Sequence, residues 1–126
     1  LIGAYEINPD YAIEVDVSFG LTSSEKPNKC GELGKGSMIG FAPVLDRCMS
    51  KQLVKVAQEN NIPYQLEVMN GETGTNADRF SVTRSGVKSA TVSIPLKYMH
   101  TPVEVIDIND VQYTADLIAE YLKTLH

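Results

Sequence analysis

One of only two histidines in the chain, His100, stands in a loop between two prolines. Pro95 and Pro102 restrict this loop, because each proline fixes its own φ and biases the residue before it toward extended geometry. The apolar residues just before the loop predict a buried strand. An imidazole held at the end of such a strand can bind a metal or carry a proton. A hydrogen-bonded structural histidine is the alternative that the residue type leaves open.

A second candidate ligand, Asp16, lies in an alternating segment, residues 11–19. β-Branched and polar residues alternate there, which predicts a strand with one apolar and one polar face. The two faces carry Ile13, Val15 and Val17 on one side and Glu14, Asp16 and Ser18 on the other. Asp16 is near the C-terminal end of this strand, where open α/β sheets place their active-site groups. A solvated carboxylate on an edge strand fits the same spacing.

The elements that must position these two residues alternate between strand and helix. Apolar runs predict further strands at residues 38–42, 64–69 and 89–94, and the period changes to helical over residues 44–60. A long polar connection, residues 20–37, contains Gly-Lys-Gly but lacks the spacing of a phosphate loop. This order predicts an α/β fold with a largely parallel sheet flanked by helices, in one domain of residues 1–126.

Two further helices are expected in the second half of the chain. Thr75 is the predicted cap of a short helix over residues 76–84, with Gly86 just beyond its end. Asp107 or Asn109 is the predicted cap of a final helix. Helical spacing predicts that one stripe of this helix is buried, namely Val111, Ala115, Ile118, Leu122 and Leu125.

Composition narrows the classes of function. The chain has 126 residues and a net charge of −5 without a cluster of Lys and Arg, so nucleic acid is not an expected partner. No apolar run approaches the roughly 20 residues that cross a bilayer, so no membrane association is expected. Two cysteines, Cys30 and Cys48, lack the spacing of a metal or redox motif. Free thiols in a cytoplasmic protein are therefore predicted.

Four motifs, taken together and in order, resemble one known family. They are residues 12–18 (AIEVDVS), 33–36 (LGKG), 73–77 (TGTNA) and 93–104 (SIPLKYMHTPVE). The chain resembles the glutamyl aminopeptidase or tetrahedral aminopeptidase family of two-metal metallopeptidases, some members of which are labelled cellulase or endoglucanase. The resemblance covers essentially the whole chain, and its most specific part surrounds His100. It implies the C-terminal half of a co-catalytic metallo-aminopeptidase catalytic domain.

The resemblance implies roles for particular residues. Asp16 matches the aspartate that binds one of two divalent ions, zinc or cobalt, and His100 matches the histidine that binds the other. Thr75 and Asn76 belong to the loop beside the substrate, although Asn76 stands where many members have Asp. Glu104, four residues after His100, is expected to orient or hydrogen-bond near the His100 loop.

The remaining parts of the family's site have no match in this sequence. They are a first histidine, an aspartate that bridges both metals, and an adjacent pair of glutamates that includes the general base. Residues 1–5 resemble those that follow the glutamate pair, so the general base is expected upstream of Leu1 and no residue of this chain is assigned to that role. One ligand per ion does not hold zinc against water. The isolated chain is therefore expected to bind no ion tightly and to be inactive.

The resemblance also implies partners, and two other functions stay open. Expected partners are peptide substrates, the missing N-terminal half of the protein and further copies in a homo-oligomer.

An endoglucanase would need two facing carboxylates in a sugar cleft, and such clefts are rich in aromatic platforms. The chain has no Trp, six Tyr and three Phe. A non-enzymatic α/β assembly module, with Asp16 and His100 structural, is the other alternative.

Overall fold

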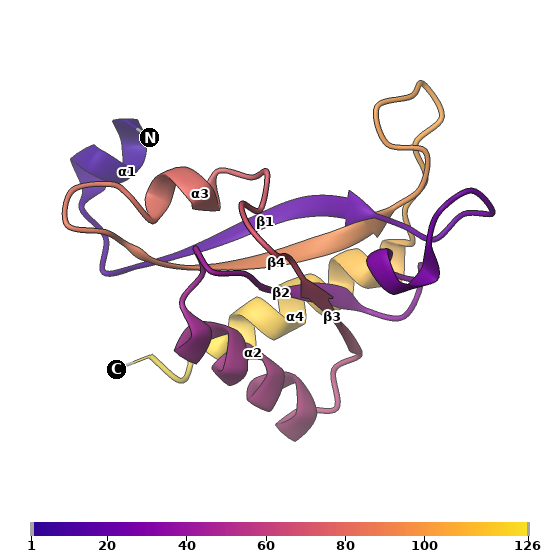
Figure 1. Ribbon diagram of the computed structural model, residues 1–126. Coiled ribbons are helices and arrows are strands. Elements are labelled where there is room, and N and C mark those ends of the chain that lie inside the picture. Colours follow the sequence, from indigo (N-terminus) through magenta and orange to yellow (C-terminus); the bar gives the residue numbers. More distant parts are fainter. Residues whose placement is uncertain (1, 126) are drawn as a thin grey trace.

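A four-stranded mixed sheet is the centre of the computed structural model, which describes residues 2–125 (Figure 1). Its strands are β1 (Tyr11–Phe19), β2 (Ser37–Phe41), β3 (Tyr64–Val68) and β4 (Lys88–Leu96), in the order β1-β4-β2-β3. The outer pairs, β1–β4 and β2–β3, are parallel, and the central β2–β4 pair is antiparallel. The predicted α/β fold with a largely parallel sheet is confirmed, with this one central exception.

The two ends of the predicted domain, Leu1 and His126, lie outside the described residues. The domain bounds of 1–126 that the sequence suggests therefore stay a prediction.

The antiparallel pair arises because β2, the following helix and β3 form a parallel unit of their own between β1 and β4 in the chain. The long connection after β1 turns the chain round before β2 begins, so β2 and β3 run against β1 and β4. Both β2 and β4 are buried along nearly their whole length. Strands buried on both faces are typical of parallel sheets, and the central β2–β4 pair departs from that tendency.

Two long helices cover one face of the sheet and a short one lies on the other (Figure 1). The long pair is α2 (Arg47–Glu59) and α4 (Ile108–Leu122), and the short helix is α3 (Ala77–Phe80). A helical turn at the start, α1 (Ile2–Ile7), and a 3-10 turn, η1 (Pro27–Lys29), complete the elements. Among residues 2–125, no helix has the length and apolar character needed to cross a membrane.

The core lies between the sheet and the two long helices. Asp46 caps α2 by accepting a hydrogen bond from the Met49 N–H at 2.9 Å, so this helix begins slightly later than the periodicity alone predicts. The residues that fill the core are at most 3% exposed: Ile39, Met49, Leu53, Val56, Ala57, Ala90, Val92, Leu117 and Tyr121. Burial of these side chains is the main source of the fold's stability.

The predicted buried stripe of the final helix is wrong by one position. The residues of α4 that face the core are Asp110, Thr114, Leu117 and Tyr121. Leu122 is 53% exposed and Leu125 is 37% exposed. The apolar pattern misled because two of the four buried positions are polar. Thr114 is satisfied within the helix, since its hydroxyl donates to the Asp110 carbonyl at 2.7 Å.

Asp110 explains the orientation of α4, because its carboxylate closes the base of the long connection before β2. One oxygen accepts a hydrogen bond from the Gly34 N–H at 2.8 Å and the other accepts one from the Gly36 N–H at 2.9 Å. Gly36 has a φ of +96°, and a Cβ there would lie 2.0 Å from the Pro63 carbonyl oxygen. The Gly-Lys-Gly sequence therefore serves a close backbone approach.

The predicted helix over residues 76–84 is also corrected, since α3 ends at Phe80. Arg84 has a φ of +53°, which is outside the right-handed helical region. The β-branched Thr83 donates its hydroxyl hydrogen bond to the Arg79 carbonyl at 2.8 Å and does not extend the helix. Thr75 does contribute at the start, where its hydroxyl accepts a hydrogen bond from the Ala77 N–H at 3.2 Å.

Candidate functional site

Asp16 lies on the polar face of the sheet, at a cavity formed where the β3–α3 connection crosses above β1. The cavity has a volume of about 570 Å³ and is lined by Asp16, Glu72, Gly74, Thr75, Asn76, Asp78 and Arg79. One oxygen of Asp16 accepts a hydrogen bond from the Val17 N–H at 2.8 Å. The lining contains three carboxylates and one guanidinium, so the cavity favours a ligand with positive charge.

Asp78 holds the loop that forms the outer wall of this cavity. Its carboxylate accepts hydrogen bonds from the Thr73 N–H at 2.7 Å, the Thr73 hydroxyl at 2.8 Å and the Gly74 N–H at 2.9 Å. Burial acts to raise the pKa of Asp78, but these hydrogen bonds together outweigh it and hold the pKa below its ordinary value. The loop is thus ordered by a charged acceptor at neutral pH.

Glu67, near the end of β3, is a half-buried carboxylate on the same face. It accepts a hydrogen bond from the hydroxyl of Ser18, which is on β1. Burial raises the pKa of Glu67, while hydrogen bonds from Ser18 and Ser93 partly oppose that rise. Ser18 lies two residues beyond Asp16 on β1, so its hydrogen bond joins Glu67 to the strand that carries Asp16.

His100 lies in a loop that projects beyond the end of β4 (Figure 1). Backbone hydrogen bonds between Lys97 and Val105, at 2.9 and 3.1 Å, close this loop at its base. Tyr98 and His100 have φ values of +59° and +62°, which are uncommon for residues other than glycine. The Glu104 carboxylate accepts a hydrogen bond from the His100 N–H at 2.7 Å and so holds this backbone in place.

The five residues singled out from the sequence fall into two groups. Asp16, Thr75 and Asn76 line one cavity. His100 and Glu104 are joined to each other in the loop after β4. Asp16 is in register with Ser93 on β4, and His100 lies four residues beyond the last residue of that strand. The roles given to all five stay predictions.

Comparison with known proteins assigns the chain to a family. Residues 2–117 match the M42 glutamyl aminopeptidase family over nearly the whole chain. The chain belongs to this family. A curated relative, the lysyl aminopeptidase of Pyrococcus furiosus, is 34% identical over 98% of the chain. The chain spans 36% of the length of that relative.

Solved structures agree with the M42 assignment. Aminopeptidase APDkam598 from the archaeon Desulfurococcus kamchatkensis is 30% identical, with a TM-score of 0.90 over 98% of this chain and 37% of its own. A protein with the label peptidase/endoglucanase is 42% identical, with a TM-score of 0.74 over 92% of this chain and 34% of its own. The Pyrococcus horikoshii TET1 peptidase can assemble into a tetrahedron or a large octahedral shell. It is 27% identical, with a TM-score of 0.68 over 96% of this chain and 36% of its own.

The M42 resemblance implies two divalent ions, and the described residues do not fit a complete centre for them. Each catalytic ion needs about three protein ligands. Within residues 2–125, no group of three or more His, Cys, Asp and Glu side chains is arranged to hold a metal. Asp16 and His100 are each able to donate one ligand atom, on separate elements. Further ligands would have to come from outside the described residues.

The general base that the resemblance implies is also not assigned to any described residue. The sequence interpretation expects it upstream of Leu1, and Leu1 itself lies outside the described residues. The structure therefore does not test this expectation, and it stays a prediction.

Three residues that matter for the geometry were missed by the sequence interpretation or passed over. The sequence pattern predicts only the direction of Glu14, gives Glu67 no role within its strand, and places Asp78 inside the helix expected over residues 76–84. The contacts of Glu14 and Glu67 join segments far apart in the chain, such as the 49 residues between Ser18 and Glu67, whereas Asp78 binds residues four and five positions before it. The alternation in β1 did place Glu14 on the face of Asp16, which was the one available signal.

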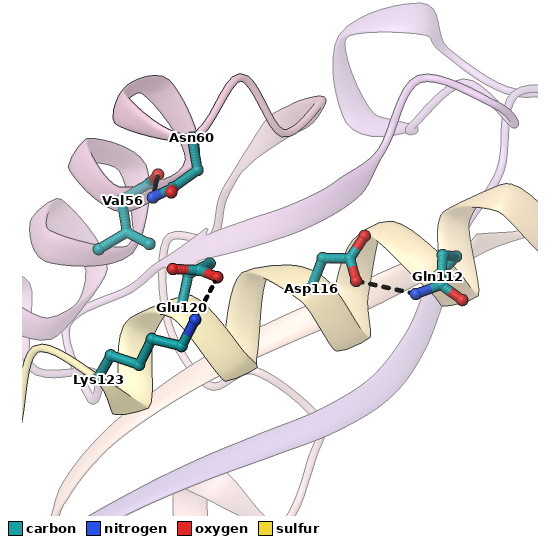
Figure 2. Close-up of polar contacts among 6 residues, drawn as sticks. All are labelled: Val56, Asn60, Gln112, Asp116, Glu120 and Lys123. Carbon is teal, nitrogen blue, oxygen red and sulfur yellow. Dashed lines mark hydrogen bonds and ion pairs between the residues drawn. The ribbon is translucent and has the colours of Figure 1, made fainter.

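A second pair of carboxylates, between the end of α2 and α4, interacts with neighbouring side chains of α4 (Figure 2). Asn60, Asp116 and Glu120 line a groove of about 270 Å³ there. Asp116 accepts a hydrogen bond from Gln112 at 2.8 Å, and Glu120 pairs with Lys123 at 2.8 Å. Asn60 donates to the Val56 carbonyl at 2.9 Å, one turn earlier in the chain. These contacts are those of a solvated surface between two helices.

Proposed function

We propose that this chain is part of a metal-dependent aminopeptidase that hydrolyses N-terminal residues from peptides with water activated by two metal ions. Membership of the M42 family is the observation that carries the proposal. Asp16 at the cavity above β1 supports it, because the lining there favours a positively charged ligand. The free α-ammonium group at the N-terminus of a peptide is such a ligand.

Asp16 and His100 are the proposed ligands, one for each divalent ion, with zinc or cobalt as the expected metals. When bound, the two ions would activate the attacking water and stabilise the developing oxyanion. Thr75 and Asn76 form the proposed substrate wall, since both line the cavity with Asp16. Glu104 is the residue proposed to hold the His100 loop in place, through the hydrogen bond from the His100 N–H.

The partner that would complete the site is proposed to dock against β1. β1 is at the edge of the sheet, and several of its apolar side chains are exposed. Val15, Val17 and Phe19 are 49%, 37% and 51% exposed. An unpaired strand edge beside exposed apolar side chains favours association. The remaining portion of the family's catalytic domain is the proposed occupant, and a homo-oligomer is the proposed assembly of the whole protein.

Hydrolysis of aminoacyl-nitroanilides tests the proposal. The isolated chain, with added zinc or cobalt, is expected to release no nitroaniline. The chain joined to the remainder of an M42 catalytic domain is expected to be active, and Asp16→Ala or His100→Ala is expected to abolish that activity and reduce the bound metal. Asp116→Asn, on the surface of α4, is the matched control. Turnover by the isolated chain, or full activity of the Asp16→Ala enzyme, would reject the assignment.

An endoglucanase is the second candidate, and the label on a relative that is 42% identical is the observation in its favour. Hydrolysis of a soluble cellulose derivative by the complete protein, with and without a chelator, separates the two. We expect no hydrolysis in either condition. Cellulose hydrolysis that survives the chelator would favour the glycosidase function.

The cytoplasmic location expected from the sequence also stays a prediction.

A further inference from the structure

The β3–α3 connection crosses the polar face of the sheet (Figure 1), and two hydrogen bonds, one at its end and one from β3 just before it, join this part of the chain to β1 on either side of Asp16. On one side, Glu14 accepts a hydrogen bond from the Asn76 N–H at 3.0 Å, between residues 62 positions apart. On the other, Glu67 accepts the hydroxyl hydrogen bond of Ser18. Glu14, Asp16 and Ser18 share one face of β1 because side chains alternate along a strand.

Glu14 is the tether that reaches the cavity itself. The residue is 9% exposed, which is rare for a glutamate unless it makes a specific interaction. The group that it binds, the backbone N–H of Asn76, belongs to a residue that lines the cavity together with Asp16 and Thr75. One hydrogen bond therefore fixes the cavity wall relative to the strand that carries Asp16.

The second carboxylate oxygen of Glu14 has no hydrogen-bond partner within the described residues. Leaving a buried polar oxygen without a hydrogen-bond partner destabilises a protein. A residue that served stability alone would be better replaced by an apolar side chain of similar volume. Sites where a local rule of this kind is broken are commonly functional.

We infer that Glu14 is a positioning residue, which sets the distance between Asp16 and the Thr75–Asn76 wall and thereby the affinity of the cavity for substrate. The inference rests on the proposed aminopeptidase function. Glu14 acts through Asn76 and does not touch the substrate. Its loss lets the wall move away from β1, and a shift of this kind weakens binding because the groups that contact the ligand lose their alignment.

Three substitutions separate the positioning role from charge and volume. Glu14→Gln keeps an acceptor oxygen for the Asn76 N–H, and Glu14→Met keeps the volume but removes the acceptor. Glu14→Asp keeps the charge with a shorter reach. Thr91→Val is the matched control, because Thr91 is in register with Glu14 on β4 and its buried hydroxyl makes no hydrogen bond within the described residues.

The experiment compares these variants in the complete enzyme and measures kcat, KM, melting temperature and amide hydrogen exchange over residues 72–79. Glu14→Met and Glu14→Asp are expected to raise KM about tenfold with a smaller change in kcat, and to speed exchange in this segment. Glu14→Gln and Thr91→Val are expected to match the wild type in KM and exchange. If Glu14→Met does not fold, the KM and amide exchange of Glu14→Asp are compared with those of Glu14→Gln, and this comparison tests the inference.

Two results would overturn the inference: unchanged KM and exchange in Glu14→Met or Glu14→Asp, or a Glu14→Gln enzyme as impaired as Glu14→Met. Failure of the proposed function looks different. In that case the wild-type enzyme releases no nitroaniline, while faster exchange of residues 72–79 in Glu14→Met would still show that the tether exists.

Discussion

Ser18 on β1 donates a hydrogen bond to the Glu67 carboxylate on β3, although β4 and β2 lie between these strands in the sheet. The side chain of Glu67 thus extends across the polar face toward the strand of Asp16. Burial raises the pKa of Glu67, against the opposing hydrogen bonds from Ser18 and Ser93. A carboxyl group whose pKa is higher in the native state than in the unfolded chain links folding to pH.

Glu67→Gln is expected to flatten the pH dependence of stability. Because the native pKa of Glu67 lies above its unfolded value of 4.5, the native state binds the proton more tightly than the unfolded state does at pH values between the two. The contribution of Glu67 is therefore complete below pH 4.5 and is lost as pH rises through the native pKa. Urea unfolding at a series of pH values measures this slope, with the exposed Glu59→Gln as control. An unchanged slope in Glu67→Gln would contradict the assignment.

The two candidate stripes of α4 give a direct test of its orientation. Leu117 is fully buried and Leu122 is 53% exposed. Leu117→Ala is expected to reduce the free energy of unfolding by about 2–5 kcal/mol, because it leaves a cavity in the core. Leu122→Ala is expected to change it by about 0.5 kcal/mol or less. Denaturant unfolding of both variants decides, and a larger loss for Leu122→Ala would favour the stripe expected from the sequence.

The sequence was sufficient for elements whose signal is local. The alternation over residues 11–19 predicted the full length of β1, and the helical period over residues 44–60 predicted α2. The error in α4 occurs where a distant contact overrides the local pattern. Asp110 turns α4 because it binds two glycine N–H groups more than 70 residues away. Likewise, nothing local to Glu14 indicated that it binds Asn76.

Asp110 is therefore expected to be essential for the long connection before β2. Asp110→Ala leaves the N–H groups of Gly34 and Gly36 without their acceptors, and we expect a loss of about 3 kcal/mol or more in the free energy of unfolding. Asp110→Asn keeps one acceptor oxygen and should lose less. Asp116→Asn, on the exposed side of α4, is the control. Equal stability of Asp110→Ala and the wild type would show that the connection is held in another way.

Glu104 is expected to hold the His100 loop in its left-handed backbone conformation. Positive φ at Tyr98 and His100 costs about 1–3 kcal/mol for each residue, so this geometry persists only while surrounding contacts maintain it. Glu104→Ala removes the acceptor of the His100 N–H, and we expect faster amide exchange over residues 98–104 and metal affinity about 10–100-fold lower in the complete protein. Glu104→Gln should retain the hydrogen bond and stay close to the wild type. Val103→Ala, an exposed position in the same loop, is the control. If Glu104→Ala and Val103→Ala behave alike in exchange and in metal titration, the loop does not depend on Glu104.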